Sequence, residues 1–85
     1  MPASHYAFRL LTLPEQLAAV WQEGIFLATR WEEENAINLY HMEGKFFAEV
    51  YYDQRQDVIV RTRTFTSLNC LEDYMPYIAL DDLEK

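Results

Sequence analysis

The sequence predicts a small α+β domain of two layers, in which a four-stranded antiparallel β-meander packs one face on two short helices. Two observations favour this fold. From Ile25 to Thr66, apolar and polar residues alternate, and three turn-forming segments interrupt the alternation. On either side of this stretch, apolar residues recur at helical spacing instead. Because the chain has 85 residues, we expect a single domain spanning residues 1–85.

Residues 5–11 form a candidate fifth, N-terminal strand. Tyr6, Phe8 and Leu10 occupy alternate positions and would share one side of an extended chain. So short a run also fits an extended lead-in that packs on the core, and the sequence leaves the placement of these residues open.

The first helix is predicted from Leu13 to Glu23. Thr12 can cap its first turn, and Glu15 stands three residues later, at the second position of a capping box. A proline near the start of a helix is tolerated, and apolar residues then recur every three or four positions. We expect Gly24 to end this helix in the left-handed region.

Turn lengths determine which side chains of the meander share a face. We predict a two-residue loop at 43–44, because its second residue is glycine and a type I′ turn needs positive φ. We place Asn35 at the left-handed position that ends the first turn, since Asn tolerates that conformation. The third loop is placed at 54–56, because this register sets opposite charges across from each other.

These three registers agree on one inner face that would carry the core. Its predicted rows are Trp31–Ile37–Val50–Val60, Thr29–Leu39–Ala48–Thr62 and Leu27–His41–Phe46–Thr64. We expect Trp21 and Trp31 to pack in this core rather than to form a ligand cage. His41 is interpreted as a packed, hydrogen-bonded core residue.

The opposite face is predicted to be too apolar for a sheet surface in water, because aromatic side chains surround a polar row. Large exposed apolar patches usually mark interfaces, and Tyr, Phe, Met and Arg are enriched there. A helix of the same chain could instead cover this face, and the sequence leaves that alternative open. The candidate interface residues are Phe26, Tyr40, Met42, Phe47, Glu49, Tyr51, Ile59, Arg61, Arg63 and Phe65.

A second helix is predicted from about Leu68 to Met75, with Ser67 as its cap. Pro76 disfavours helix continuation, so we expect a kink or a second short turn through Leu80. The tail from Asp81 to Lys85 is predicted to fray, with Leu83 as a candidate docking point on the domain. Cys70 is expected to be partly buried.

The net charge of −7 argues against nucleic-acid and anionic-membrane binding, both of which need basic surfaces. It is compatible with a basic protein partner, although solubility alone accounts for it. No apolar run approaches the roughly 20 residues of a membrane helix, and no signal peptide is evident. One cysteine excludes an internal disulfide. We therefore expect a cytoplasmic protein.

The sequence predicts no catalytic, cofactor or metal site. His41 has no partner at metal-ligand spacing, and the chain lacks a glycine-rich phosphate loop and a nucleophile–base motif. Glu49 and Arg61 are interpreted as an ordinary exposed cross-strand pair. The three consecutive glutamates at 32–34 are interpreted as a solvated hairpin tip that could also meet a basic partner.

The leading hypothesis is a non-catalytic protein-interaction module that self-associates through the aromatic outer face. A symmetric dimer would set Tyr40, Phe47 and Tyr51 against their copies. One alternative is an acidic inhibitor, immunity-type or chaperone-like binder of a basic protein. Another is a small-molecule pocket between helices and sheet, with His41, Tyr52 and Thr64 near its mouth.

Overall fold

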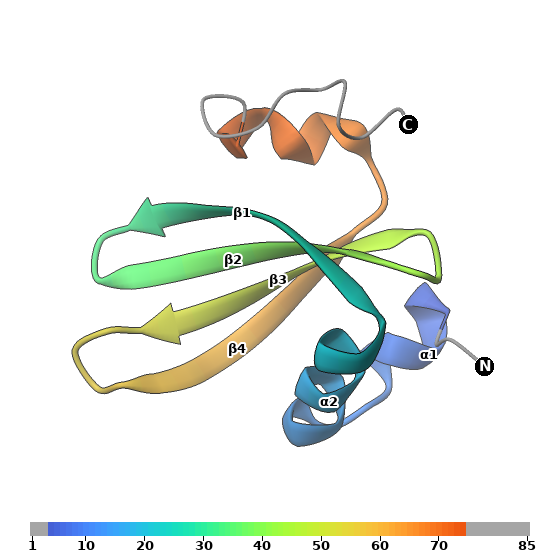
Figure 1. Cartoon of the computed structure of the whole chain (residues 1–85), viewed down its shortest axis with the longest axis horizontal. Helices are drawn as coiled ribbons and strands as arrows, with labels where there is room; N and C mark the ends of the chain where they lie inside the picture. Colours follow the sequence, from blue (N-terminus) through green and yellow to red (C-terminus); the bar gives the residue numbers. More distant parts are fainter. Residues whose placement is uncertain (1–3, 75–85) are drawn as a thin grey trace.

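The computed structural model describes residues 4–74, apart from the side chains of residues 70, 72 and 73. It confirms the predicted α+β fold with a four-stranded antiparallel meander in the order β1-β2-β3-β4 (Figure 1). The elements are α1 (His5–Arg9), α2 (Leu13–Glu23), β1 (Gly24–Glu32), β2 (Asn35–Met42), β3 (Phe46–Asp53), β4 (Val58–Phe65) and the 3₁₀-helix η1 (Leu68–Tyr74).

The candidate fifth strand is instead the short helix α1. The side chain of Ser4 caps it by accepting a hydrogen bond from the Ala7 backbone N–H at 3.1 Å. Helical geometry sends only Phe8 into the core, whereas Tyr6 and Leu10 remain exposed. The alternation that suggested a strand was therefore misleading, because two of its three apolar side chains lie mostly in water.

The predicted start of α2 is confirmed. Thr12 and Glu15 form a reciprocal capping box, in which the Glu15 carboxylate accepts the Thr12 backbone N–H at 2.9 Å. The predicted ending is wrong in its conformation, because Gly24 is extended, with φ −88° and ψ 145°. A Cβ at this position would lie 2.7 Å from the Val20 carbonyl oxygen, so close approach explains the glycine.

The β2–β3 hairpin has a three-residue loop instead of the predicted two-residue one. Lys45 carries the positive φ, at 65°, and Gly44 does not. Met42 therefore pairs with Phe46, and Leu39 pairs with Glu49. Since successive residues of a strand face opposite sides, this shift of one residue moves every side chain of β3 to the other face relative to β2.

The outer two registers also differ from the predictions. In the first hairpin Glu33 is the left-handed residue, at φ 56°, so Glu32 pairs with Asn35 and a bulge follows Phe26. In the third, the loop runs over residues 54–57 and ends at Asp57 with φ 59°. A second bulge lies in β4, and such bulges bend and twist edge strands.

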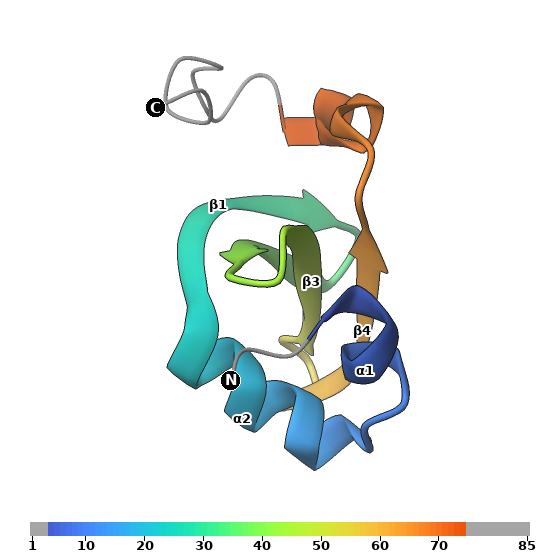
Figure 2. The same cartoon turned by 90° about the vertical axis from the view of Figure 1, so that its right-hand side faces the viewer.

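Helical elements cover both faces of the sheet, rather than one as predicted (Figure 2). The helices α1 and α2 lie on one side, called here the helix side. Their core contains Phe8, Val20, Met42, Phe46, Ala48 and Val50. Two side-chain hydrogen bonds fasten this layer to β4: the Thr62 hydroxyl donates to Gln16 at 2.6 Å, and His5 Nε2 lies 2.7 Å from the Thr64 hydroxyl.

The helix η1 covers the other face, called here the η1 side, with Leu71 and Tyr74 fully buried. Beneath it lie Ala28, Leu39, Phe47 and Phe65. The predicted cap is present, since the Ser67 hydroxyl accepts the Asn69 backbone N–H at 3.2 Å. The predicted turn through Leu80 and the C-terminal tail lie outside the described residues.

No helix within residues 4–74 is long and apolar enough to cross a membrane.

Candidate interaction surface

The residues predicted to share one outer face are divided between both faces. The register shift in the β2–β3 hairpin causes this division, because it reverses the parity of β3 and β4. Phe26, Tyr40, Met42 and Ile59 lie on the helix side, whereas Phe47, Glu49, Tyr51, Arg61, Arg63 and Phe65 lie on the η1 side.

The η1 side holds a buried polar cluster that sequence reasoning missed. The Tyr74 hydroxyl donates a hydrogen bond of 2.5 Å to Oε2 of Glu49, which also accepts Nη2 of Arg30 at 3.2 Å. The side chains of Glu49 and Arg30 are only 2% and 11% exposed. Arg30 also pairs with Glu32 at 2.9 Å. The cluster therefore links η1 to β3 and β1.

Two groups of the cluster, Tyr74 and Arg30, have raised pKa values. Burial, followed by the hydrogen bond to Glu49, raises the pKa of Tyr74 above its ordinary value, so the phenol remains a donor. Burial alone would lower the pKa of Arg30, but its hydrogen bonds and the Glu49 carboxylate raise that pKa overall. A buried carboxylate with these partners serves to fix η1 on the sheet.

The expected exposed pair of Glu49 with Arg61 is wrong. Glu49 pairs across the ladder with Arg63, whose Nε lies 3.4 Å from Oε1. Arg61 lies instead over the ring of Tyr51, with its Cζ 4.1 Å from the ring centroid. Tyr51 is itself buried, so Arg61 covers its ring on the part of the sheet beside η1.

On the helix side, α2 covers only part of the sheet and leaves aromatic side chains open. Tyr40 lies between Trp21 and Phe26, with ring centroids 5.8 Å and 5.7 Å away and both pairs edge-on. Trp21 and Phe26 are 56% and 54% exposed. Burial of the Tyr40 ring raises the pKa of its phenol.

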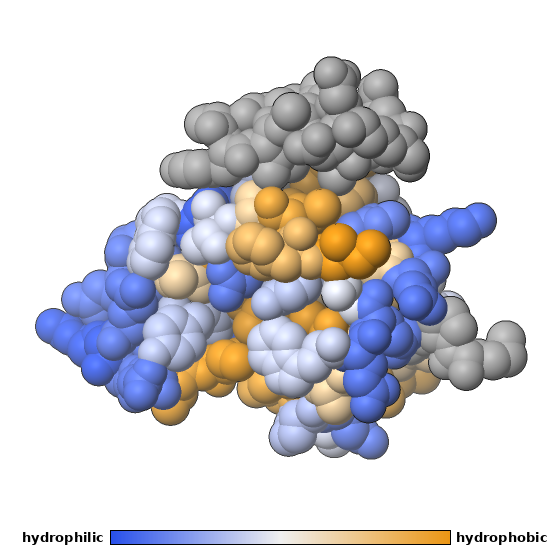
Figure 3. All heavy atoms as spheres, in the orientation of Figure 1, coloured by the Kyte–Doolittle hydropathy of each residue, from blue (hydrophilic) through white to orange (hydrophobic). Residues whose placement is uncertain are grey.

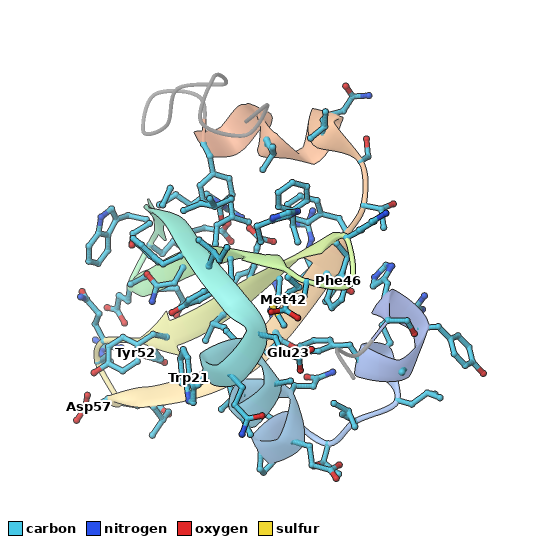
Figure 4. All side chains as sticks on the ribbon, turned by 45° about the vertical axis from the view of Figure 1, so that its right-hand side comes forward. Trp21, Glu23, Met42, Phe46, Tyr52 and Asp57 are labelled. Carbon is cyan, nitrogen blue, oxygen red and sulfur yellow. The ribbon has the colours of Figure 1, made fainter. Side chains whose placement is uncertain are left out.

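A second aromatic row lies nearer the hairpin tips. Trp31 and Tyr52 flank the small, buried Ala36, because these residues pair across β1, β2 and β3. Figure 4 shows Tyr52 toward the same end of the sheet as Asp57, away from Met42 and Phe46. Trp31 is 56% exposed.

Between the two rows lies one polar pair, in which the Thr29 hydroxyl donates to the Asn38 amide oxygen at 2.6 Å. The amide nitrogen of Asn38 has no acceptor within residues 4–74. We call the whole area the aromatic surface. Its residues are Trp21, Phe26, Thr29, Trp31, Ala36, Asn38, Tyr40 and Tyr52.

The prediction that Trp21 and Trp31 pack in the core is wrong. The physical reason is length: an 11-residue helix spans roughly 16 Å, whereas strands of eight or nine residues span roughly 26–30 Å. With only the five residues of α1 beside it, α2 cannot cover the whole face. This mismatch of lengths was the signal available in the sequence.

The residues of the small-molecule hypothesis do not come together. His41 is exposed on the η1 side, where its ring lies 5.2 Å from that of Phe47, so it is not the packed core residue expected. Tyr52 and Thr64 lie on the helix side, and the Thr64 hydroxyl contacts His5. Among the side chains that the structure describes, which exclude those of residues 70, 72 and 73, no three His, Cys, Asp or Glu gather as a metal site.

Comparison with known proteins found no matching family model, no matching curated protein and no matching solved structure.

Proposed function

We propose that this chain is a non-catalytic protein-interaction domain that binds its partner through the aromatic surface. One observation carries the proposal: Trp21 of α2 and Phe26 and Trp31 of β1 are each more than half exposed on the helix side of a single small sheet. Apolar patches of this kind mark interaction sites, and Trp and Tyr supply most hot spots of binding energy. The two rows around Asn38 combine such anchors with a polar group.

The polar cluster on the η1 side supports a binding role over a catalytic one. Glu49 and Tyr74 are the strongest candidates for proton transfer, but both side chains are buried and joined by a hydrogen bond. Chemistry at Glu49 would require η1 to leave the sheet, and Leu71 would then lose its packing.

The hypothesis of a symmetric dimer needed Phe47 and Tyr51 on an open face. Both are buried in the single chain, so they offer little surface to a second copy. The large aromatic groups that remain in water lie on the helix side, and we place the interaction there.

Site-specific photo-crosslinking in the cells that make the protein tests this proposal. A benzophenone amino acid replaces Trp31 or Phe26 in the aromatic surface, and replaces His41 as an exposed control on the opposite face. We expect the first two positions, but not the control, to give a discrete adduct with another protein. Absence of adducts at both surface positions, or equal adducts from position 41, would contradict the proposal.

A further inference from the structure

We propose that the aromatic surface binds a protein segment in which apolar side chains stand next to lysine or arginine. This inference rests on the proposed function and specifies the chemistry of the partner. The distribution of charge around the surface supports this chemistry.

The sheet separates its charges between its two faces. Arg30, Arg61 and Arg63 all lie on the η1 side, where they contact Glu49, Tyr51 or Phe65. All side chains that the four strands direct to the helix side are uncharged. The aromatic surface therefore has no cation of its own with which to hold an acidic partner.

Acidic groups border this surface at the hairpin tips. The row Glu32–Asn35–Asp53 directly follows the row Trp31–Ala36–Tyr52 along the strands, but its side chains point to the η1 side. The acidic residues next to the aromatic surface are therefore the exposed ones in the tip loops, Glu33, Glu34 and Asp57. Figure 3 shows hydrophilic residues gathered at the left end, which is the tip end in Figure 1.

The carboxylates at this end are only partly neutralised. Arg55 is the only basic residue in the two tip loops, and it pairs with Glu34 at 3.5 Å. Asp53 accepts the Arg55 and Gln56 backbone N–H groups. The exposed carboxylates of Glu33 and Asp57 have no partner within residues 4–74. Two acidic groups are thus left to meet cations from a partner.

These features favour one kind of partner at the aromatic surface. Apolar side chains would pack against the two aromatic rows, and the Asn38 amide would donate to the partner between them. A lysine or arginine would reach Glu33 or Asp57 and could lie over the ring of Trp31. A second copy fits poorly, because each copy carries a net charge of −7 and would bring its own acidic tips.

Titration with designed peptides tests the inference, followed by the fluorescence of the two tryptophans. The probes are a leucine/lysine peptide, a leucine/glutamate peptide of the same pattern, and a serine/lysine peptide of the same charge. We expect the leucine/lysine peptide to bind at least tenfold more tightly than either of the others, and less tightly as salt rises. If the leucine/lysine peptide bound no more tightly than either of the other two peptides, the inference would be overturned.

Matched variants separate local recognition from general attraction to an acidic protein. Glu33→Gln at the acidic tip should weaken binding of the leucine/lysine peptide about twofold to fivefold. Glu43→Gln makes the same charge change in the exposed loop at the opposite end of the sheet and should leave binding unchanged. Equal effects of these two substitutions would mean that only the net charge matters, and the inference would fail.

The crosslinking experiment tests the proposed function and the peptide titration tests the partner chemistry, so either can give a negative result without the other. Adducts from position 31 combined with equal binding of the leucine/lysine and leucine/glutamate peptides would retain the proposed function and reject the partner chemistry. Absence of adducts combined with selective, Glu33-dependent peptide binding would instead contradict the proposed function in the cell.

Discussion

Replacing Tyr74 by Phe removes one hydroxyl from the interface between η1 and the sheet. That hydroxyl donates to the Glu49 carboxylate at 2.5 Å, and both residues are almost fully buried. A hydrogen bond to a charged group contributes about 1.5–3 kcal/mol, so we expect Tyr74→Phe to lower the free energy of unfolding by about 2 kcal/mol. In a domain of this size, that loss lowers the Tm by about 10 °C. Urea and thermal unfolding followed by far-UV circular dichroism measure both quantities.

Tyr51→Phe is the matched control, because Tyr51 is equally buried on the same face. Its hydroxyl lies 3.5 Å from Nη2 of Arg30, at the limit of a hydrogen bond, and the ring beneath Arg61 is retained. We expect a loss below about 0.5 kcal/mol. Equal losses for the two variants, or no loss for Tyr74→Phe, would refute the placement of η1 over Glu49.

Three further substitutions test the local geometry by chemical unfolding. Gly24→Ala should cost about 1–3 kcal/mol, because its Cβ would meet the Val20 carbonyl oxygen; a neutral result would contradict that close approach. Lys45→Gly should raise the free energy of unfolding by about 1 kcal/mol, because Lys45 has φ 65° and glycine adopts that conformation at less cost. Destabilisation would instead indicate the two-residue loop at 43–44, with Lys45 inside the strand. Hydrogen bonds from Thr12, the backbone one first, lower the pKa of Glu15 below 4.5, so its contribution is present above that pH and lost as pH falls through the lowered pKa. Glu15→Gln should therefore lose less stability than the parent as the pH falls from neutral through 4.5 and then through the lowered pKa of Glu15, and equal losses would contradict the capping box.

Local signals in the sequence predicted the elements well. Thr12 and Glu15 predicted the start of α2 because a capping box is formed by neighbouring residues alone. The four strands and their meander order followed from alternation and short loops. The helix α1 was missed because five residues are too few to distinguish a helical period from alternation.

Registers could not be predicted because the left-handed positions fell on unexpected residues. Glycine and asparagine adopt positive φ at least cost, so Gly44 and Asn35 were the natural choices. The structure uses Glu33 and Lys45 instead. Each misplaced turn shifts a strand by one residue, and such a shift exchanges its inner and outer side chains.

This error in register also decided which functional residues were found. Glu49 was interpreted as an exposed charge because a carboxylate beneath a helix is rare and depends on partners distant in sequence, such as Tyr74 and Arg30. Trp21 and Trp31 were assigned to the core because most large apolar residues lie there. The lengths of the helix and strands indicate that α2 cannot cover the whole face, but which side chains it leaves exposed depends on where α2 lies on the sheet, and that needs the assembled fold.

The accessibility of the two tryptophans tests the central claim of an open aromatic surface most directly. Acrylamide quenching of the native protein's fluorescence, at low micromolar concentration, reports only Trp21 and Trp31, because the chain has no other tryptophan. With each residue 56% exposed, we predict efficient quenching by a single class of accessible fluorophore and emission close to that of tryptophan in water. Weak quenching with blue-shifted emission would show that the two side chains are enclosed, and would contradict the account.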